Sequence, residues 1–257
     1  MEPKVRGQEM KKRMRILLII AIALVPGNAL RILLYRILLG YRIDIHSQIG
    51  PFNYIDVAEC ELHGATIGRF NEVRARRLIM GPKSSLRRFN RIRFANHVML
   101  SEESVIVSRN TIIGTSGKIS PYKKYENFSL GFGSIVTIGH HFDISDSITI
   151  NENVTFAGIG CQAWTHGFDT SHVKIQGPIM IGSNVYIGSG SIILQGLLIS
   201  DNVSIGAGTV VSKSITESGF YVSSGLLRKG VAGNYGDDPN LVSSEGYKFL
   251  RRIPIAN

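Results

Sequence analysis

Residues 175–211, IQGPIMIGSNVYIGSGSIILQGLLISDNVSIGAGTVV, repeat an apolar pattern with a period of six. A large aliphatic side chain stands at every sixth position, namely Ile175, Ile181, Ile187, Ile193, Ile199, Ile205 and Val211. A companion register two residues earlier is apolar or small, with Ile179, Val185, Ser191, Leu197, Val203 and Thr209. Because side chains two residues apart lie on the same face of a strand, each repeat offers one inward-facing pair. A period of six would scatter these residues over different faces of an α-helix, so the pattern favours short strands.

Glycine or asparagine follows three residues after the aliphatic positions, at Asn184, Gly190, Gly196, Asn202 and Gly208. These two residue types enter the left-handed backbone conformation most readily, so we expect a turn at each of them. One repeat of strand and turn cannot bury its apolar face alone, and stacking of successive repeats completes the core. The pattern therefore predicts a parallel β-helix.

Residues 181–215, IGSNVYIGSGSIILQGLLISDNVSIGAGTVVSKSI, resemble the hexapeptide-repeat acyltransferases, in particular the O-acetyltransferases of polysaccharides and lipopolysaccharides. The resemblance is specific over residues 132–231 and weaker over residues 55–113. It implies an all-β fold, a left-handed parallel β-helix of hexapeptide repeats, and a homotrimer. We expect this domain at residues 46–232, after an N-terminal helical segment of residues 1–45 and before a C-terminal tail of residues 233–257.

The period of six is also present earlier in the chain. The inward positions that it predicts are Ile67, Val73, Ile79, Phe94, Leu100, Ile106, Ile112, Phe132, Ile138, Ile144, Ile150 and Phe156. Their companions are Ile92, Val98, Val136, Phe142, Ile148 and Val154. Nineteen residues separate Phe156 from Ile175, which is not a multiple of six. A loop is therefore expected to leave the coil at residues 157–174 and to carry the active site.

The expected loop contains WTHGFD at residues 164–169. This T-H-x-x-D arrangement resembles the active-site histidine loop of hexapeptide acyltransferases that act on sugars, which implies that His166 is the catalytic base and that Trp164 contacts substrate. A neutral imidazole, with a pKa of ~6.5, can accept the proton of an alcohol as the alcohol attacks a thioester. Asp169 is the local candidate for fixing the histidine tautomer. The three other histidines near this point, His140, His141 and His172, are expected to be structural or peripheral.

Two other chemistries are possible for this group of residues. The β-helical carbonic anhydrases bind zinc through three histidines, and His141, His166 and His172 could form such a trio, but the surrounding loop favours an acyltransferase and no metal is expected. Cys161 could form an acyl-cysteine, although the role of a small buried hydrophobe is favoured. The only other cysteine is Cys60, so a disulfide framework is not expected and a reducing compartment is favoured.

The resemblance also implies acetyl-CoA as the acyl donor, bound at the C-terminal repeats. In GAGTVVSK, residues 206–213, the small Gly206 and Ala207 permit close approach of the pantetheine arm, and Lys213 could meet a phosphate. Ser189 is expected in the same site. Arg228 and Lys229 are the remaining candidates for the nucleotide phosphates, although the usual glycine-x-proline-alanine run of the family is absent before them.

The N-terminal segment is basic and apolar. Lys11, Lys12, Arg13 and Arg15 precede an apolar run at residues 16–25, and a second apolar segment with interspersed arginines covers residues 29–41. Ten apolar residues are about half of the ~20 that a spanning helix needs, so we expect helices that lie on the membrane or dip into it. A cleaved signal peptide and a helix pair packed on the protein's own core are the alternatives.

Net charge is +10, which predicts acidic partners such as phosphates or anionic lipid. A basic run between residues 69 and 93 consists of Arg69, Arg74, Arg76, Arg77, Lys83, Arg87, Arg88, Arg91 and Arg93. It is either a solvated face or a contact for a membrane surface or a diphosphate-linked acceptor. Nucleic acid is not expected, because the run has few interleaved aromatics and no recognition-helix pattern.

We therefore expect an acetyl-CoA-dependent O-acetyltransferase that modifies a sugar hydroxyl of a surface polysaccharide or of its lipid-linked precursor. Its expected location is the cytoplasmic side, at the inner face of the plasma membrane. An N-acetyltransferase for a nucleotide-linked amino sugar is the alternative enzyme, and a catalytically silent β-helical scaffold is the alternative without chemistry.

Overall fold

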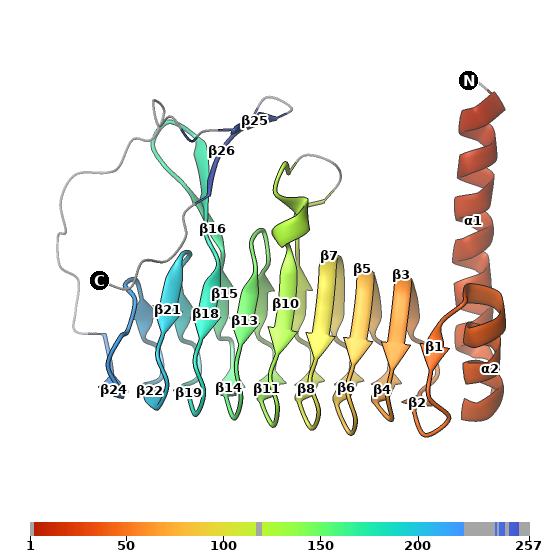
Figure 1. Cartoon of the computed structure of the whole chain (residues 1–257), viewed down its shortest axis with the longest axis horizontal. Helices are drawn as coiled ribbons and strands as arrows, with labels where there is room; N and C mark the ends of the chain where they lie inside the picture. Colours follow the sequence, from red (N-terminus) through yellow and green to blue (C-terminus); the bar gives the residue numbers. More distant parts are fainter. Residues whose placement is uncertain (1–2, 117–119, 224–239, 241, 245–246, 252–257) are drawn as a thin grey trace.

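Short parallel strands stack coil upon coil behind two N-terminal helices in the computed structural model, which describes residues 3–116, 120–223, 240, 242–244 and 247–251 (Figure 1). In Figure 1 the front strands run downward while the chain advances from right to left, which makes the β-helix left-handed. Successive coils pair in parallel through a 13-stranded sheet and a 9-stranded sheet. The structure confirms the predicted left-handed parallel β-helix.

The prism has three faces, named here in chain order. In the first coils, β3 (Tyr54–Leu62), β5 (Glu72–Met80) and β7 (Arg91–Leu100) run across faces 1 and 2 without a break. In later coils face 1 contains β9 (Thr111–Ile113), β12 (His141–Asp143), β15 (Gln162–Trp164), β20 (Ile192–Ile193) and β23 (Val210–Val211). Face 2 contains β1 (Arg42–Ile43), β10 (Asn127–Leu130), β13 (Ile148–Ile150), β18 (Ile179–Ile181) and β21 (Leu197–Ile199). Face 3 contains β2 (Gln48–Ile49), β4 (Thr66–Arg69), β6 (Ser85–Arg88), β8 (Val105–Ser108), β11 (Ile135–Ile138), β14 (Thr155–Ile159), β19 (Tyr186–Ile187), β22 (Val203–Ile205) and β24 (Gly219–Tyr221).

The core follows the predicted pattern closely after residue 178. Both registers from Ile179 to Val211 are buried, and all five predicted turn residues have a positive φ, between 57° and 72°. Five predicted inward positions outside this stretch are wrong or only half-buried. Phe132 lies in a turn and Ile138 follows a register shift in β11, so both are exposed; Ile79 and Phe94 are half-buried. Ile175 belongs to a hairpin and not to a coil.

Asparagine side chains stack inside the corner that links face 3 to face 1, called corner 3–1 below. Asn53, Asn71, Asn90 and Asn110 are buried, and the Oδ1 atom of each accepts the backbone N–H of the next rung at 2.8 to 3.0 Å. Next to the ladder, the exposed rings of Phe52, Phe70 and Phe89 stack at 5.1 Å. The ladder satisfies buried backbone donors, and its repetition sets the register of the N-terminal coils.

Two helices, α1 (Pro3–Leu24) and α2 (Asn28–Leu39), cover the N-terminal end of the prism (Figure 1). Buried residues of both helices pack on the first coil, and Arg15 of α1 pairs with Asp56 of β3 at 2.8 Å. The outward side chains are apolar and exposed: Met14, Leu17, Ile20, Leu24, Leu30, Leu33, Ile37 and Leu38. No helix in the described residues is both long enough and apolar enough to cross a membrane. The helices therefore pack on the core with one face and present an apolar surface with the other.

Excursions leave the prism at the corner between faces 1 and 2, called corner 1–2 below. One excursion joins β9 to β10 and contains the 3₁₀ helix η1 (Lys123–Tyr125); the other is the antiparallel hairpin of β16 (His166–Phe168) and β17 (Val173–Gln176). The C-terminal strands β25 (Val242–Ser244) and β26 (Tyr247–Arg251) extend this hairpin into a 4-stranded sheet. The coil continues through β14 and β15, so the hairpin begins nine residues after the expected start of the loop at residue 157.

Candidate active site

His166 stands at the base of the hairpin, two residues after β15 leaves face 1. Its Nδ1 atom contacts the carboxylate of Asp143 and lies 3.2 Å from Ser145 Oγ. Asp143 ends β12 and pairs with Trp164 in the neighbouring coil, which explains why residues 23 positions apart meet. In the described part of the chain no residue hydrogen-bonds to Nε2, and the His166 side chain is 25% exposed. One ring nitrogen is thus anchored, while the other has no hydrogen-bond partner in the described residues.

The electrostatics favour one tautomer of His166. Burial opposes ionisation of Asp143, but the hydrogen bonds from His166 and Ser145, with the nearby charges of His166 and Lys174, outweigh it and lower the pKa of Asp143. Asp143 is therefore an anion at neutral pH and accepts a hydrogen bond from Nδ1–H. The lone pair of the neutral ring is left on Nε2, where it can accept a proton.

Lys174 of β17 extends this cluster below the hairpin. Its Nζ atom lies 3.0 Å from Ser145 Oγ and 3.4 Å from Thr115 Oγ1, and the residue is 8% exposed. Burial lowers the pKa of Lys174, although the charges of Asp143 and Glu126 act in the opposite direction. Ser145 therefore links the lysine to the Asp143–His166 pair.

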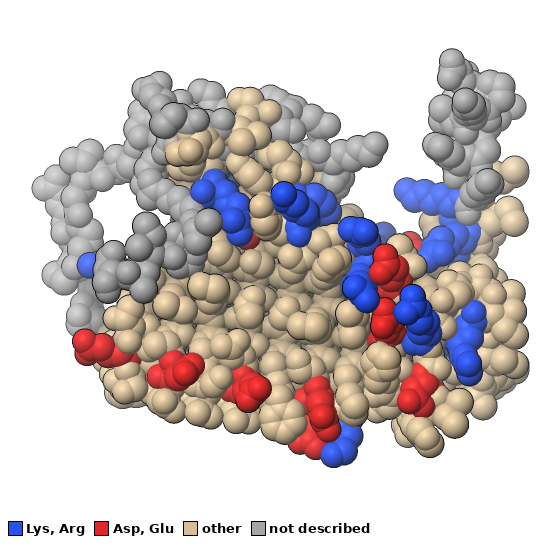
Figure 2. Space-filling model, in the orientation of Figure 1, with Lys and Arg blue, Asp and Glu red and all other residues tan. Residues whose placement is uncertain are grey.

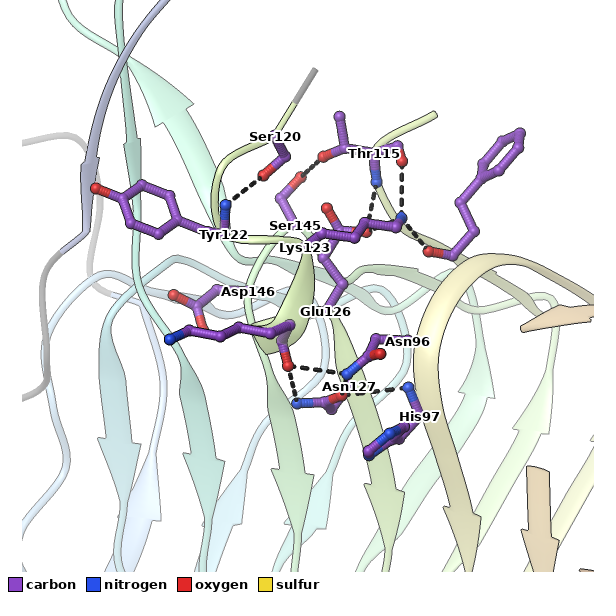
Figure 3. Close-up of polar contacts among 12 residues, drawn as sticks. Asn96, His97, Thr115, Ser120, Tyr122, Lys123, Glu126, Asn127, Ser145 and Asp146 are labelled. Atoms are coloured by element: carbon purple, nitrogen blue, oxygen red, sulfur yellow. Dashed lines mark hydrogen bonds and ion pairs between the residues drawn. The ribbon is translucent and has the colours of Figure 1, made fainter. Parts of the chain in front are cut away.

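An ion pair between the half-buried Lys123 and the buried Glu126 holds the first excursion against this cluster (Figure 3). The Lys123 ammonium contacts the Glu126 carboxylate, the Phe94 carbonyl and, at 2.9 Å, the Thr115 carbonyl. Glu126 also accepts the Thr115 N–H at 3.1 Å, and burial raises the pKa of Glu126. These contacts fix the backbone at Thr115, whose hydroxyl lies 3.4 Å from Ser145 Oγ.

The C-terminal strand β26 braces the hairpin from the outside. It pairs in parallel with β17, and Arg251 binds the buried carboxylate of Asp146 at 2.6 and 3.1 Å. The Arg251 guanidinium also lies 4.0 Å from the ring centroid of Tyr125 in the first excursion. Arg251 therefore ties the tail, the hairpin and η1 together around His166.

Several residues proposed from the sequence lie in this neighbourhood. The Trp164 ring lies 6.4 Å from that of His166 and 4.9 Å from that of His141, and Trp164 Nε1 donates to Gln162. Asp169 lies at the turn of the hairpin, where its Oδ1 accepts the N–H groups of Ser171 and Val173. The structure therefore places Asp143, and not the predicted Asp169, at Nδ1, because the antiparallel pairing of β16 carries Asp169 away from the coil.

The other histidines and Cys161 have local structural contacts. His140 continues the asparagine ladder: its N–H donates to Asn110, and its Nδ1 accepts the Cys161 N–H at 3.0 Å. Burial lowers the pKa of His140 to about 4, and burial also raises the pKa of the Cys161 thiol. His172 is exposed in the hairpin turn. Within the described residues no group of three or more His, Cys, Asp or Glu side chains is placed to hold a metal ion.

The expected acyl-donor residues divide between two corners. Lys213 is exposed at corner 1–2, after β23, which lies two strands beyond β15 on face 1. Ser189, Gly206 and Ala207 lie at corner 3–1, where Ser189 Oγ bonds to Ile159. Gly206 is closely packed, since an added Cβ would lie 2.8 Å from Val222. Arg228 and Lys229 fall outside the described residues.

Sequence reasoning missed Asp143, Ser145, Lys174 and the Asp146–Arg251 pair. The signal was present in residues 141–147, HFDISDS, where two acids and two serines interrupt an apolar repeat. Residues 142–146 are all buried, which a regular alternation of inward and outward side chains cannot produce. Polar residues at such a point are expected either to satisfy each other or to form a site.

Comparison with known proteins finds only distant structural similarity. No protein-family model and no curated protein matches the chain. A crystal structure of a mutant of AntD, an N-acyltransferase from Bacillus cereus in complex with dTDP and coenzyme A, is 16% identical, with a TM-score of 0.34 over 62% of this chain and 73% of that one. The polySia-specific acetyltransferase NeuO is 16% identical, with a TM-score of 0.30 over 78% and 85%. At these scores neither likeness bears on the fold or the reaction of this chain.

Proposed function

We propose that this protein is an acyltransferase that moves an acetyl group from acetyl-CoA to a sugar hydroxyl, with His166 as general base. The observation that carries the proposal is the Asp143–His166 pair, which anchors Nδ1 and leaves Nε2 without a described partner in a partly exposed site. The sequence around His166 resembles the histidine loop of sugar acyltransferases, and a carboxylate at Nδ1 supports the role of a base because it fixes the tautomer.

The proposed reaction conserves the protonation state of the site. His166 accepts the hydroxyl proton at Nε2 while the sugar oxygen forms its bond to the thioester carbonyl carbon. The tetrahedral intermediate then breaks the carbon–sulfur bond, and the imidazolium returns the proton to the leaving thiolate. Asp143 stabilises the imidazolium between the two steps.

The acceptor class rests on the resemblance of residues 164–169 to the histidine loop of acyltransferases that act on sugars. Ser145, Thr115 and Lys174 contact one another beside His166, and the buried Ser145 and Lys174 hold the Asp143–His166 pair in place. We infer that the acceptor is a sugar of a surface polysaccharide or of its lipid-linked precursor. The acetyl donor would lie across face 1. At corner 3–1, Gly190 and Gly208 have nothing within 4 Å of an added Cβ, and at corner 1–2 Lys213 offers a charge for a phosphate.

Replacing His166 by Ala tests the role of the base. General-base assistance supplies about 10²–10⁴-fold of rate, so turnover should fall at least about a hundredfold while the protein stays folded and its acetyl-CoA affinity stays unchanged. The measurement is release of free thiol from acetyl-CoA with isolated surface glycan, with mass spectrometry to identify an ester or amide product. His172→Ala, in the exposed hairpin turn, is the matched control. Near-normal turnover of folded His166→Ala would show that His166 is not the general base.

We also propose that the protein attaches to the membrane and forms a homotrimer. The apolar outer surface of α1 and α2 is flanked by Lys12, Arg13 and Arg36, which suits an anionic lipid surface at the inner face of the plasma membrane. His166 lies on an outer corner, so a second copy packed there would supply the remaining wall of a pocket. A threefold axis parallel to the prism would place all three helical caps on the same side.

Removal of residues 1–42 tests the attachment. The truncated chain should leave the membrane pellet for the soluble fraction, because the exposed apolar surface of both helices is gone. Light scattering on the full-length protein measures the oligomeric state. A folded truncated protein that still sediments with membranes would assign the attachment to another surface.

A further inference from the structure

Face 3 contains a hollow of about 320 Å³ that the acyl-transfer chemistry does not use. It is lined by Thr66, Gly68, Arg69, Ser85, Arg87, Arg88, Val107, Ser108 and Ile138 from β4, β6, β8 and β11. His166 follows β15 of face 1, so the hollow and the catalytic histidine belong to different faces of the prism. We name this feature the arginine hollow.

The three arginines of the hollow differ from most of their neighbours in the same basic run. Arg74, Arg77, Arg91, Arg93 and Lys83 each have a carboxylate partner, namely Glu72, Glu59, Glu61 or Glu103, at 2.7 to 3.5 Å. Among the described residues no carboxylate lies within 4.0 Å of Arg69, Arg87 or Arg88, and all three are exposed. Arg76 of β5 is also exposed and has no carboxylate partner among the described residues, but it is a single charge, whereas face 3 gathers three such arginines in one hollow.

Stacking brings the uncompensated charges close together. Arg69 and Arg88 are register partners in adjacent coils, and the next partner along the ladder is Ser108. Like charges directly opposite each other in a sheet are destabilising, so an anion bound between the two arginines would lower the free energy of the folded protein. Guanidinium groups bind phosphate oxygens with paired N–H donors, and two or three of them around one hollow can hold one or two phosphate groups.

The remaining lining suits the same ligand. The hydroxyls of Thr66 and Ser85 make no hydrogen bond to any described residue, so they can donate to a phosphate oxygen. Val107 and Ile138 form an apolar side of the hollow, where charge-assisted hydrogen bonds are less screened than in open solvent. We propose that the arginine hollow binds the phosphate or diphosphate group of an organic ligand.

A double variant with a charge-matched control tests the site in the full-length protein. Arg69→Gln with Arg88→Gln removes two unpaired charges, whereas Arg74→Gln with Arg91→Gln removes two charges already paired with Glu72. Inorganic pyrophosphate, titrated by calorimetry at fixed salt, should bind the wild type and the control alike. Its affinity for the Arg69/Arg88 double variant should fall at least about tenfold, because each lost contact is a charge-assisted hydrogen bond.

A second arm distinguishes the sources of the phosphate. If sedimentation with phosphatidylglycerol vesicles, compared with phosphatidylcholine vesicles, also falls in the Arg69/Arg88 variant, the ligand is a lipid headgroup. If vesicle binding is unchanged while pyrophosphate affinity falls, the ligand is a soluble phosphate compound. Both results support the hollow as a phosphate site.

Three outcomes would overturn the proposal. They are no pyrophosphate binding by the wild type, equal losses in the two double variants, and a change in oligomeric mass in the Arg69/Arg88 variant alone. The last would mean that a second copy neutralises the arginines with its acidic side chains, which Figure 2 shows spaced along one edge of the molecule. Exposed acidic residues in turns are Glu102, Glu103, Glu152 and Asp201. Because binding is measured without acyl transfer, failure here leaves the proposed reaction untouched.

Discussion

Polar residues are arranged differently at corners 3–1 and 1–2 of the prism. At corner 3–1 one residue type is stacked coil upon coil, with asparagine from Asn53 to Asn110 and then His140. At corner 1–2 the stack is broken by two excursions, and the polar side chains around His166 differ in every coil. Repetition satisfies the backbone of a solenoid, whereas a break in the repetition places different chemical groups at one point.

Two histidines illustrate the difference, the buried His140 and the partly exposed His166. Both ring nitrogens of His140 have hydrogen-bond partners, namely the Thr137 hydroxyl and the Cys161 N–H. In His166 only Nδ1 has such a partner among the described residues, and Nε2 has none. The comparison predicts that changes at corner 1–2 alter turnover and that changes at corner 3–1 alter stability.

The largest expected effect on turnover in this comparison belongs to Asp143→Asn. An amide at this position cannot stabilise the imidazolium as a carboxylate does, so turnover should fall about ten- to a hundredfold with little change in substrate affinity. Asp169→Asn is the matched control, because the amide keeps the Oδ1 acceptor for Ser171 and Val173. Equal losses in the two variants, measured with both proteins folded, would return the orienting role to Asp169.

Lys213→Glu should have the next largest effect. Lys213 lies two strands beyond β15 on the corner that carries His166, and a glutamate there would repel the phosphates of acetyl-CoA. We expect the Michaelis constant for acetyl-CoA to rise about tenfold with turnover at saturation unchanged. An unchanged Michaelis constant would exclude Lys213 from the donor site.

A smaller effect is expected from Arg251→Gln at the brace of the hairpin. The variant leaves the buried Asp146 carboxylate without its cation, so the hairpin should loosen and turnover should fall several-fold. Hydrogen exchange of residues 173–176, which pair with β26, should become faster. The double variant Arg251→Gln with Asp146→Asn removes the unpaired charge and should recover part of the loss. Unchanged hydrogen exchange of residues 173–176 in Arg251→Gln would show that the Arg251–Asp146 pair does not stabilise the hairpin.

Sequence patterning predicted the regular part of the molecule better than its site. The period of six predicted the parallel β-helix and the turns at residues such as Asn184, because both depend on local spacing. The left-handedness and the base candidate His166 came from the resemblance to the hexapeptide acyltransferases. Asp143 could not be assigned from spacing alone, since the bulge before β15 and the hairpin after it change the coil length on both sides. Lys174 and Arg251 reach the site through long-range pairing of β17 with β26, for which the sequence carries no periodic signal. Asp169 was preferred because it is near in sequence, and the antiparallel hairpin overturned that preference.

The smallest effect on turnover is expected from His140→Asn at corner 3–1. Asparagine is the residue of the preceding rungs, and its Oδ1 could accept the Cys161 N–H as Asn53 Oδ1 accepts the Asn71 N–H at 2.8 Å. Turnover and the free energy of unfolding at neutral pH should therefore stay near the wild-type values. The free energies of unfolding of the wild type and the His140→Asn variant should differ only at acidic pH.

Burial lowers the pKa of His140 to about 4, below the ordinary value of 6.5. Because the folded protein holds the neutral ring more strongly than the unfolded chain does, its stabilising effect is complete above pH 6.5 and is lost as the pH falls toward 4. A shift of this size corresponds to about 3 kcal/mol in the free energy of unfolding. Urea unfolding at pH 7 and pH 4 should thus show a loss in the wild type that exceeds the loss in His140→Asn by about that amount. His172→Asn, at an exposed turn with a positive φ that asparagine tolerates, should keep the wild-type pH dependence. If His140→Asn keeps it as well, His140 is not a neutral rung of the ladder and the contrast between the two corners fails at that residue.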